Sequence, residues 1–137
     1  MKTETKTTIS EFIDHNQIRM STQETDHNPN MANSDHMDHY RCTLLAGRSR
    51  MTIVFSKGSG HNGVWPTIPE VLDCLASDAS SVDNAGSFED WCADFGYSTD
   101  SRTAKKTFDV VERQARSLRK LLGDSAFETL LYSVERD

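Results

Sequence analysis

Two histidines and a cysteine stand three residues apart in the first third of the chain, and zinc binding is the first chemistry to consider for them. His36, His39 and Cys42 offer the imidazole nitrogen and thiolate sulfur that zinc takes as ligands. A structural zinc site needs four ligands, however, and the chain has no second close pair of this kind. In a regular strand, His39 and Cys42 would also face opposite ways. These residues therefore either bind zinc or belong to a solvated polar segment. Apart from zinc, we expect no cofactor.

Residues 58–63 match the glycine pattern G-x-G-x-x-G, which in dinucleotide-binding folds opens a helix onto a pyrophosphate. Here Trp65 and Pro66 follow, and proline disfavours helix in the residue before it. We therefore expect a structural turn. The alternative is a surface loop in which His61, Asn62 and Trp65 contact a partner.

Basic residues recur on one side of the segment 101–122, which has the apolar spacing of a long helix. This basic stripe, opposite the apolar positions, consists of Arg102, Lys106, Arg113, Arg116 and Lys120. Such a stripe could bind phosphates or an acidic protein. The alternative is an ordinary solvated helix face whose charges pair with the acidic middle of the chain.

That acidic middle, residues 58–101, contains eight Asp and Glu side chains and no Lys or Arg. It could imitate the phosphates of DNA. The competing explanation is ordinary helix starts, because Glu70, Glu89 and Asp90 fall in predicted first turns, where carboxylates favour the helix dipole.

Catalysis finds little support, and we expect no enzymatic activity. The chain lacks the G-x-S-x-G pattern of a nucleophile elbow. Cys74 and Cys92 lie on or beside apolar helix faces, where buried and inert thiols are usual. The aromatic residues of this region are more typical of a core than of a base-stacking platform: Trp65, Trp91, Phe95 and Tyr97.

The elements that must position these residues begin with strands. Residues 40–45 and 50–56 alternate in polarity around a turn at Gly47, which predicts a hairpin. A third strand is expected around 18–22, preceded by a short helix over 9–16 that begins with a Thr8 and Glu11 capping box. We expect residues 1–7 to be disordered and residues 23–38 to form a long polar loop.

The second half predicts about four helices, three of which should begin at hydroxyl residues: Thr67, Ser87 and Ser125. The longest, over 101–122, should end at Gly123. Strands first and helices after indicate a single α+β domain over 1–137, with a small three-stranded antiparallel sheet packed against the helices. The expected core consists of Phe12, Leu44, Ile53, Phe55, Leu72, Leu75, Trp91, Phe108, Val111, Leu118, Leu122 and Leu131.

Composition limits the setting in which the protein works. The 137 residues carry a net charge of -6, which argues against general attraction to nucleic acid or anionic membranes. No apolar run approaches the roughly 18 residues of a membrane helix, and the N-terminus does not look like a secretory signal. Three dispersed cysteines favour a reducing cytoplasm over a disulfide framework.

Several segments resemble a widespread family of small phage and mobile-element proteins. They are FSKGSGHNG (55–63), VLDCLASDA (71–79), SFEDWCADFGYSTDSR (87–102) and ERQARSLRKLLGD (112–124), together with ISEFIDHNQIRMS and DHNPNM nearer the N-terminus. The resemblance assigns no catalytic residue. It implies a role in conflict with the bacterial host, of the kind that anti-CRISPR and anti-restriction inhibitors have.

We therefore expect a cytoplasmic inhibitor that binds a host defence complex, with a CRISPR–Cas effector as the first candidate. It should act by protein–protein contact through the basic stripe and the loop at His61, Asn62 and Trp65. We expect no binding to free nucleic acid near physiological salt and none to membranes. The alternative is a zinc-binding or nucleic-acid-binding accessory protein of a mobile element.

The zinc alternative makes a direct prediction. If His36, His39 and Cys42 hold the metal, the protein purified without chelators should contain about one equivalent of zinc, and a chelator should lower its melting temperature. Elemental analysis and thermal denaturation measure both quantities. A metal-free protein whose melting temperature does not respond to the chelator contradicts the zinc site.

Overall fold

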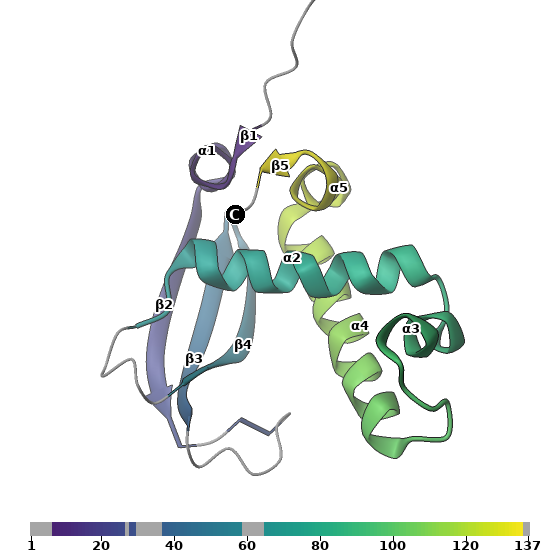
Figure 1. Cartoon of the computed structure of the whole chain (residues 1–137). Coiled ribbons are helices and arrows are strands. Elements are labelled where there is room, and N and C mark those ends of the chain that lie inside the picture. The colour runs from purple at the N-terminus through teal and green to yellow at the C-terminus, as the bar shows by residue number, and fades with distance from the viewer. Residues whose placement is uncertain (1–6, 27, 30–36, 59–64, 136–137) are drawn as a thin grey trace, which may run out of the picture.

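The computed structural model describes residues 7–26, 28–29, 37–58 and 65–135. Within them, β2 (Ile18–Thr25), β3 (Met37–Ala46) and β4 (Ser49–Gly58) form an antiparallel sheet in the order β2-β3-β4. The helices α2 (Ile68–Ala85), α3 (Phe88–Phe95), α4 (Arg102–Leu122) and α5 (Asp124–Tyr132) follow the sheet, and the short α1 (Ile9–His15) precedes it. The predicted α+β class, with strands before helices, is confirmed (Figure 1).

The hairpin forms as predicted, because Gly47 takes the left-handed conformation that its turn requires, with φ of 60°. The pairing extends further than expected. On β2 it runs from Ile18 opposite Ala46 to Thr25 opposite His39. Residues 23–25 and 37–38 are therefore strand residues, so the expected polar loop over 23–38 is wrong at both ends: polar side chains are compatible with a strand whose one face is solvated.

The two faces of the sheet differ, because side chains alternate along each strand. On β3, Tyr40, Cys42 and Leu44 are buried, whereas Arg41 between them is exposed. We call the face of Tyr40, Cys42 and Leu44 the inner face and the opposite one the outer face.

Helix α2 covers the inner face. It crosses the sheet and continues over α4, so that it contacts both (Figure 1). Leu72 and Leu75 on α2 are buried in one cluster with Leu44 of the sheet and Leu118 of α4. This cluster is the main core of the protein.

Most of the expected core is confirmed, with two differences. Phe55 and Leu122 are half-buried at the margin of the main core. Leu121 is buried instead of Leu122, in the cluster that contains Phe127 and Leu130 of α5. In the last turn of α4, the buried side of the helix therefore faces α5.

Helix starts follow the capping signals in three of four cases. Thr8 and Thr67 form complete capping boxes with Glu11 and Glu70, and the Ser87 hydroxyl accepts from the backbone N–H of Asp90. The expected start at Ser125 is wrong. Helix α5 begins at Asp124 with no side-chain cap, because Gly123 turns the chain directly from α4 into α5 at φ 86°.

Two short parallel strands pair near the two ends of the described chain. Strand β1 (Thr7–Thr8) pairs with β5 (Val134–Glu135), and Thr7 lies opposite Val134. The expected disorder over 1–7 is therefore wrong at Thr7, and residues 1–6 lie outside the described residues.

The central position of Leu118 predicts a large effect on stability. Leu118 is 0% exposed, so Leu118→Ala should lower the free energy of unfolding by about 2–5 kcal/mol through lost burial and a cavity. Lys106→Ala, on the exposed side of the same helix, should change it by about 0.5 kcal/mol or less. Urea denaturation measures both variants. Equal effects of the two substitutions would contradict the assignment of α4 to the core.

Candidate functional site

The basic stripe of α4 is exposed along its whole length, as its position opposite the buried Phe108, Val111 and Leu118 requires. Arg116 pairs with Glu112, with 3.2 Å between its Nη1 and the Glu112 Oε1. The other four members form no ion pair with another described residue. Within the described chain, the partner of the stripe therefore lies on α4 itself and not in the acidic middle segment.

Sequence reasoning missed a second group of basic residues, on the outer face of the sheet. Arg19, Arg41 and Arg50 are all exposed, and none forms an ion pair with a described residue. The strand register places Arg19 and Arg50 on either side of Leu45. The alternation of polarity could have shown that these arginines share a face, but the register needed to place them in rows comes from the structure.

Helix α3 carries an aromatic patch at the end of the molecule away from the sheet (Figure 1). Trp91 is buried, and its ring lies 5.0 Å from that of Phe95 and 5.4 Å from that of Tyr97, measured between centroids. Phe95 and Tyr97 themselves are 52% and 48% exposed. The expectation that both are core residues is wrong, because α3 is too short and too peripheral to bury more than one side of itself.

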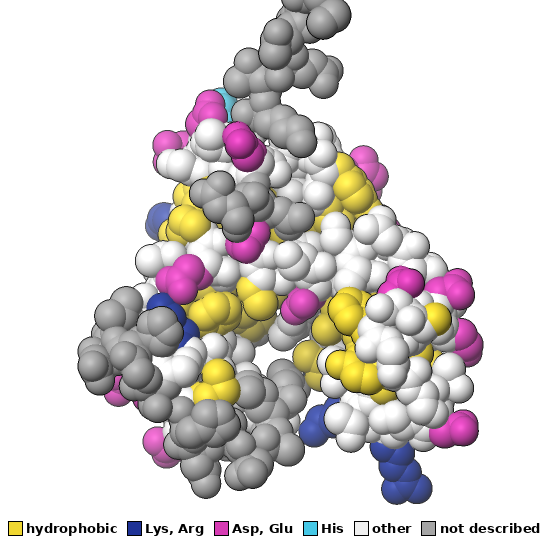
Figure 2. All heavy atoms as spheres, in the orientation of Figure 1, with side chains coloured by type: hydrophobic (Ala, Val, Ile, Leu, Met, Phe, Trp, Pro, Cys, Tyr) yellow, Lys and Arg dark blue, Asp and Glu magenta, His cyan; other side chains and the backbone are white. Residues whose placement is uncertain are grey.

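The segment that carries these rings also carries four carboxylates. Glu89, Asp90, Asp94 and Asp100 are all exposed. In Figure 2, hydrophobic side chains gather over α3 with acidic ones around them, whereas Lys and Arg show mainly at the left and lower edges. We call Phe95 and Tyr97, with these four carboxylates, the acidic aromatic patch.

The structure separates the described members of the expected zinc set. His39 is buried on the outer face, where its Nδ1 lies 2.6 Å from the Ser56 Oγ, and Asn28 donates to the same hydroxyl. Cys42 is buried on the inner face, in the main core. His36 lies outside the described residues. Among those described, no group of three His, Cys, Asp or Glu side chains is arranged to hold a metal ion.

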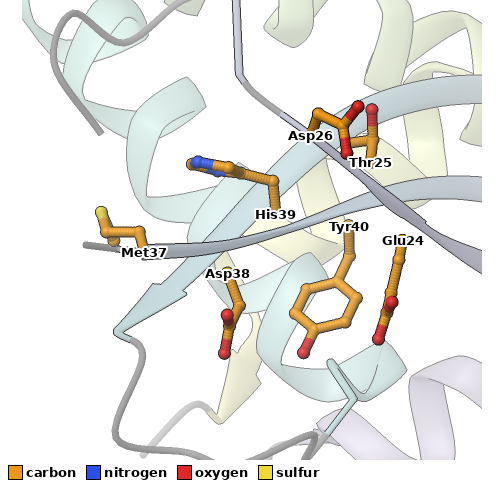
Figure 3. Close-up of a pocket in the computed structure, with 7 residues that line it drawn as sticks. All are labelled: Glu24, Thr25, Asp26, Met37, Asp38, His39 and Tyr40. Atoms are coloured by element: carbon orange, nitrogen blue, oxygen red, sulfur yellow. The ribbon is translucent and has the colours of Figure 1, made fainter. Parts of the chain in front are cut away.

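An open cavity of about 280 Å³ lies where β2 ends and β3 begins (Figure 3). Glu24, Asp38 and Tyr40 point to one side of the sheet there, whereas His39, Thr25 and Asp26 point to the other (Figure 3). Burial, followed by the charges of Asp38 and Glu24, raises the pKa of Tyr40. Because His39 and the two carboxylates of the Tyr40 side are on opposite faces, they do not form an acid–base pair.

The expected partner loop is described only in part. His61 and Asn62 lie outside the described residues. Trp65 is 44% exposed, and its ring lies 5.2 Å from that of Tyr40, so one side of it packs on the sheet. Trp65 therefore lies at the margin of the fold and is not part of a base-stacking platform.

Comparison with known proteins returns nothing: no family model, curated protein or solved structure matches the chain. None of the helices in the described part is both long and apolar enough to cross a membrane. The assignment of function therefore depends on the surfaces described above.

The exposed cysteine leads to a prediction about nucleophilic chemistry. Partial burial of its thiol, then the charges of Asp78 and Asp73, raise the pKa of Cys74 to about 11. Because the thiolate is the nucleophile, iodoacetamide at pH 8 should label Cys74 about 100-fold more slowly than an unperturbed cysteine, and labelling should accelerate as the pH rises toward 11. Cys42 and Cys92, both buried, should be labelled only after unfolding in urea.

A time course followed by mass spectrometry measures these rates. Labelling of native Cys74 at pH 8 as fast as that of a short peptide would contradict the raised pKa.

Proposed function

We propose that this chain is a binding protein that inhibits a host defence effector, with a CRISPR–Cas complex as the first candidate. The observation that carries the proposal is the acidic aromatic patch on α3. Exposed, closely spaced aromatic rings are the usual anchors of protein–protein interfaces, and charged residues usually form the rim around them.

The charge of the rim indicates the chemistry of the partner. Three exposed carboxylates on α3 and a fourth just after it complement a basic surface. Helix α3 itself contains no Lys or Arg, although Lys105 of α4 lies 5.0 Å from the Phe88 ring. RNA-guided effectors hold nucleic acid in positively charged channels, so a compact acidic protein with aromatic anchors can occupy such a channel. The resemblance to phage proteins supports this class of target. The basic stripe, the contact expected from the sequence, is not part of this patch.

A plating assay tests the proposal. Bacteria whose CRISPR–Cas system targets a phage should permit that phage to plate at least tenfold better when they express the chain. Phe95→Ala/Tyr97→Ala should abolish this rescue, because it removes the anchors and leaves the buried Trp91 in place. Tyr132→Ala is the matched control, since Tyr132 on α5 is also 52% exposed but lies outside the patch. Circular dichroism should show that both variants fold.

The outcomes separate two claims. If the wild-type chain rescues no phage across a panel of CRISPR–Cas types, the proposed target is wrong. If the double variant rescues as well as the wild type does, the target class holds but the acidic aromatic patch is not the contact.

A further inference from the structure

We propose that the outer face of the sheet and the basic stripe of α4 form one surface that binds the phosphate backbone of double-stranded nucleic acid. This inference goes beyond the proposed function and does not require it. Helix α2 orients the two elements.

Helix α2 contacts both the sheet and α4, and its buried side chains share one cluster with the inner face and with Leu118. The outer face and the basic stripe lie opposite these packed sides. Apart from Arg116, which lines a cavity with Ala79 and Asp83 of α2, they are therefore turned away from α2. The arginines of the sheet and the other basic residues of the stripe consequently share one side of the molecule.

The two parts meet at a groove between β4 and α4. A cavity of about 220 Å³ lies there, and Thr52, Val54, Arg113, Gln114 and Ser117 are among its lining residues. Arg113 belongs to the basic stripe, whereas Thr52 and Val54 belong to the outer face. The groove therefore lies between the two basic regions, and Pro29, Val110 and the inner-face residues Met51 and Ile53 line it as well.

The residue types on the outer face match those that contact nucleic-acid backbones. Three rows cross the strands: Arg19, Leu45 and Arg50; Ser21, Thr43 and Thr52; Gln23, Arg41 and Val54. Arginine, hydroxyl and amide side chains provide most phosphate contacts, and these rows contain no carboxylate. Neighbouring strands are about 4.8 Å apart, so the backbones at Arg19 and Arg50 are about 10 Å apart, enough to contact separate phosphates.

The same rows disfavour two other partners. They contain no aromatic side chain to anchor a protein interface, and none on which the bases of a single strand could stack. A charged, hydroxyl-rich face instead suits a duplex that is held by its backbone without sequence preference.

The net charge of -6 does not prevent binding at the outer face, because α3 and its carboxylates lie at the end of the molecule away from the sheet (Figure 1). At physiological salt the Debye length is about 8 Å, less than the roughly 14 Å radius of gyration of a domain this size. Distant carboxylates are therefore largely screened at the outer face. Binding to free duplex should still be weak near 150 mM salt, in keeping with the expectation from the sequence.

Fluorescence anisotropy with a labelled 20-base-pair DNA duplex of mixed sequence tests the inference on the full chain. We expect binding at 50 mM NaCl that weakens more than 100-fold by 200 mM, as about five phosphate contacts require. Arg19→Gln/Arg50→Gln on the sheet and Arg113→Gln/Lys120→Gln on α4 should each weaken binding at 50 mM at least tenfold. Each should also lower the salt slope by about 2.

Lys105→Gln/Arg119→Gln is the control, because it removes the same charge from α4 outside the stripe, where both residues are ion-paired. It should change affinity less than threefold.

Equal weakening by the control and by the sheet pair, or no binding at 50 mM, overturns the inference. Binding to poly-glutamate but not to the duplex overturns it in favour of an acidic protein partner. Phe95→Ala/Tyr97→Ala should leave duplex binding unchanged, so a failure here is distinct from a failure in the plating assay.

Discussion

The packing of α2 against two different surfaces at once is the constraint on which the rest of the structure depends. The sheet has three strands, too few to enclose a core, and α4 alone could not cover its inner face. By lying across both, α2 buries Leu44 and Leu118 in one cluster. Its first turn is tied to the sheet, because the nearly buried Lys57 ammonium lies 3.1 Å from the Glu70 carboxylate, which also completes the helix cap. Burial alone would raise the pKa of Glu70, but Lys57 and Thr67 outweigh it, and the pKa is lowered.

This arrangement also distributes the charge of the molecule. Because α2 occupies the inner face, the described helices do not cover the arginines on the outer face of the strands. Four carboxylates of the middle segment lie along α2, and the other four lie on α3 or just after it. An acidic protein can in this way carry a basic face, because the two signs are segregated by the packing and screened from each other by salt. Net charge is therefore a poor guide to what this chain binds.

Local patterns predict the elements of this fold well, and they fail where a neighbour decides the outcome. Thr8 and Thr67 were identifiable as helix starts because a capping box uses residues three apart. Ser125 fits the same pattern, but Gly123 takes the N-cap position, so α5 starts two residues earlier than expected. Phe95 has the spacing of a buried helix residue, and Tyr97 was expected in the core with it. No rule on spacing could show that α3 packs at the end of the molecule, where no further element covers them.

The same limit applies to predicting the candidate surfaces. The basic stripe could be predicted because all its members lie on one helix, whose periodicity is fixed. The arginines of the outer face come from three strands, and a shift of one residue in register would turn each of them into the core. Their assembly therefore depends on the pairing of β2 with β3 and of β3 with β4. Since burial of the inner face fixes that register, the same apolar packing that stabilises the fold also aligns the basic residues outside it.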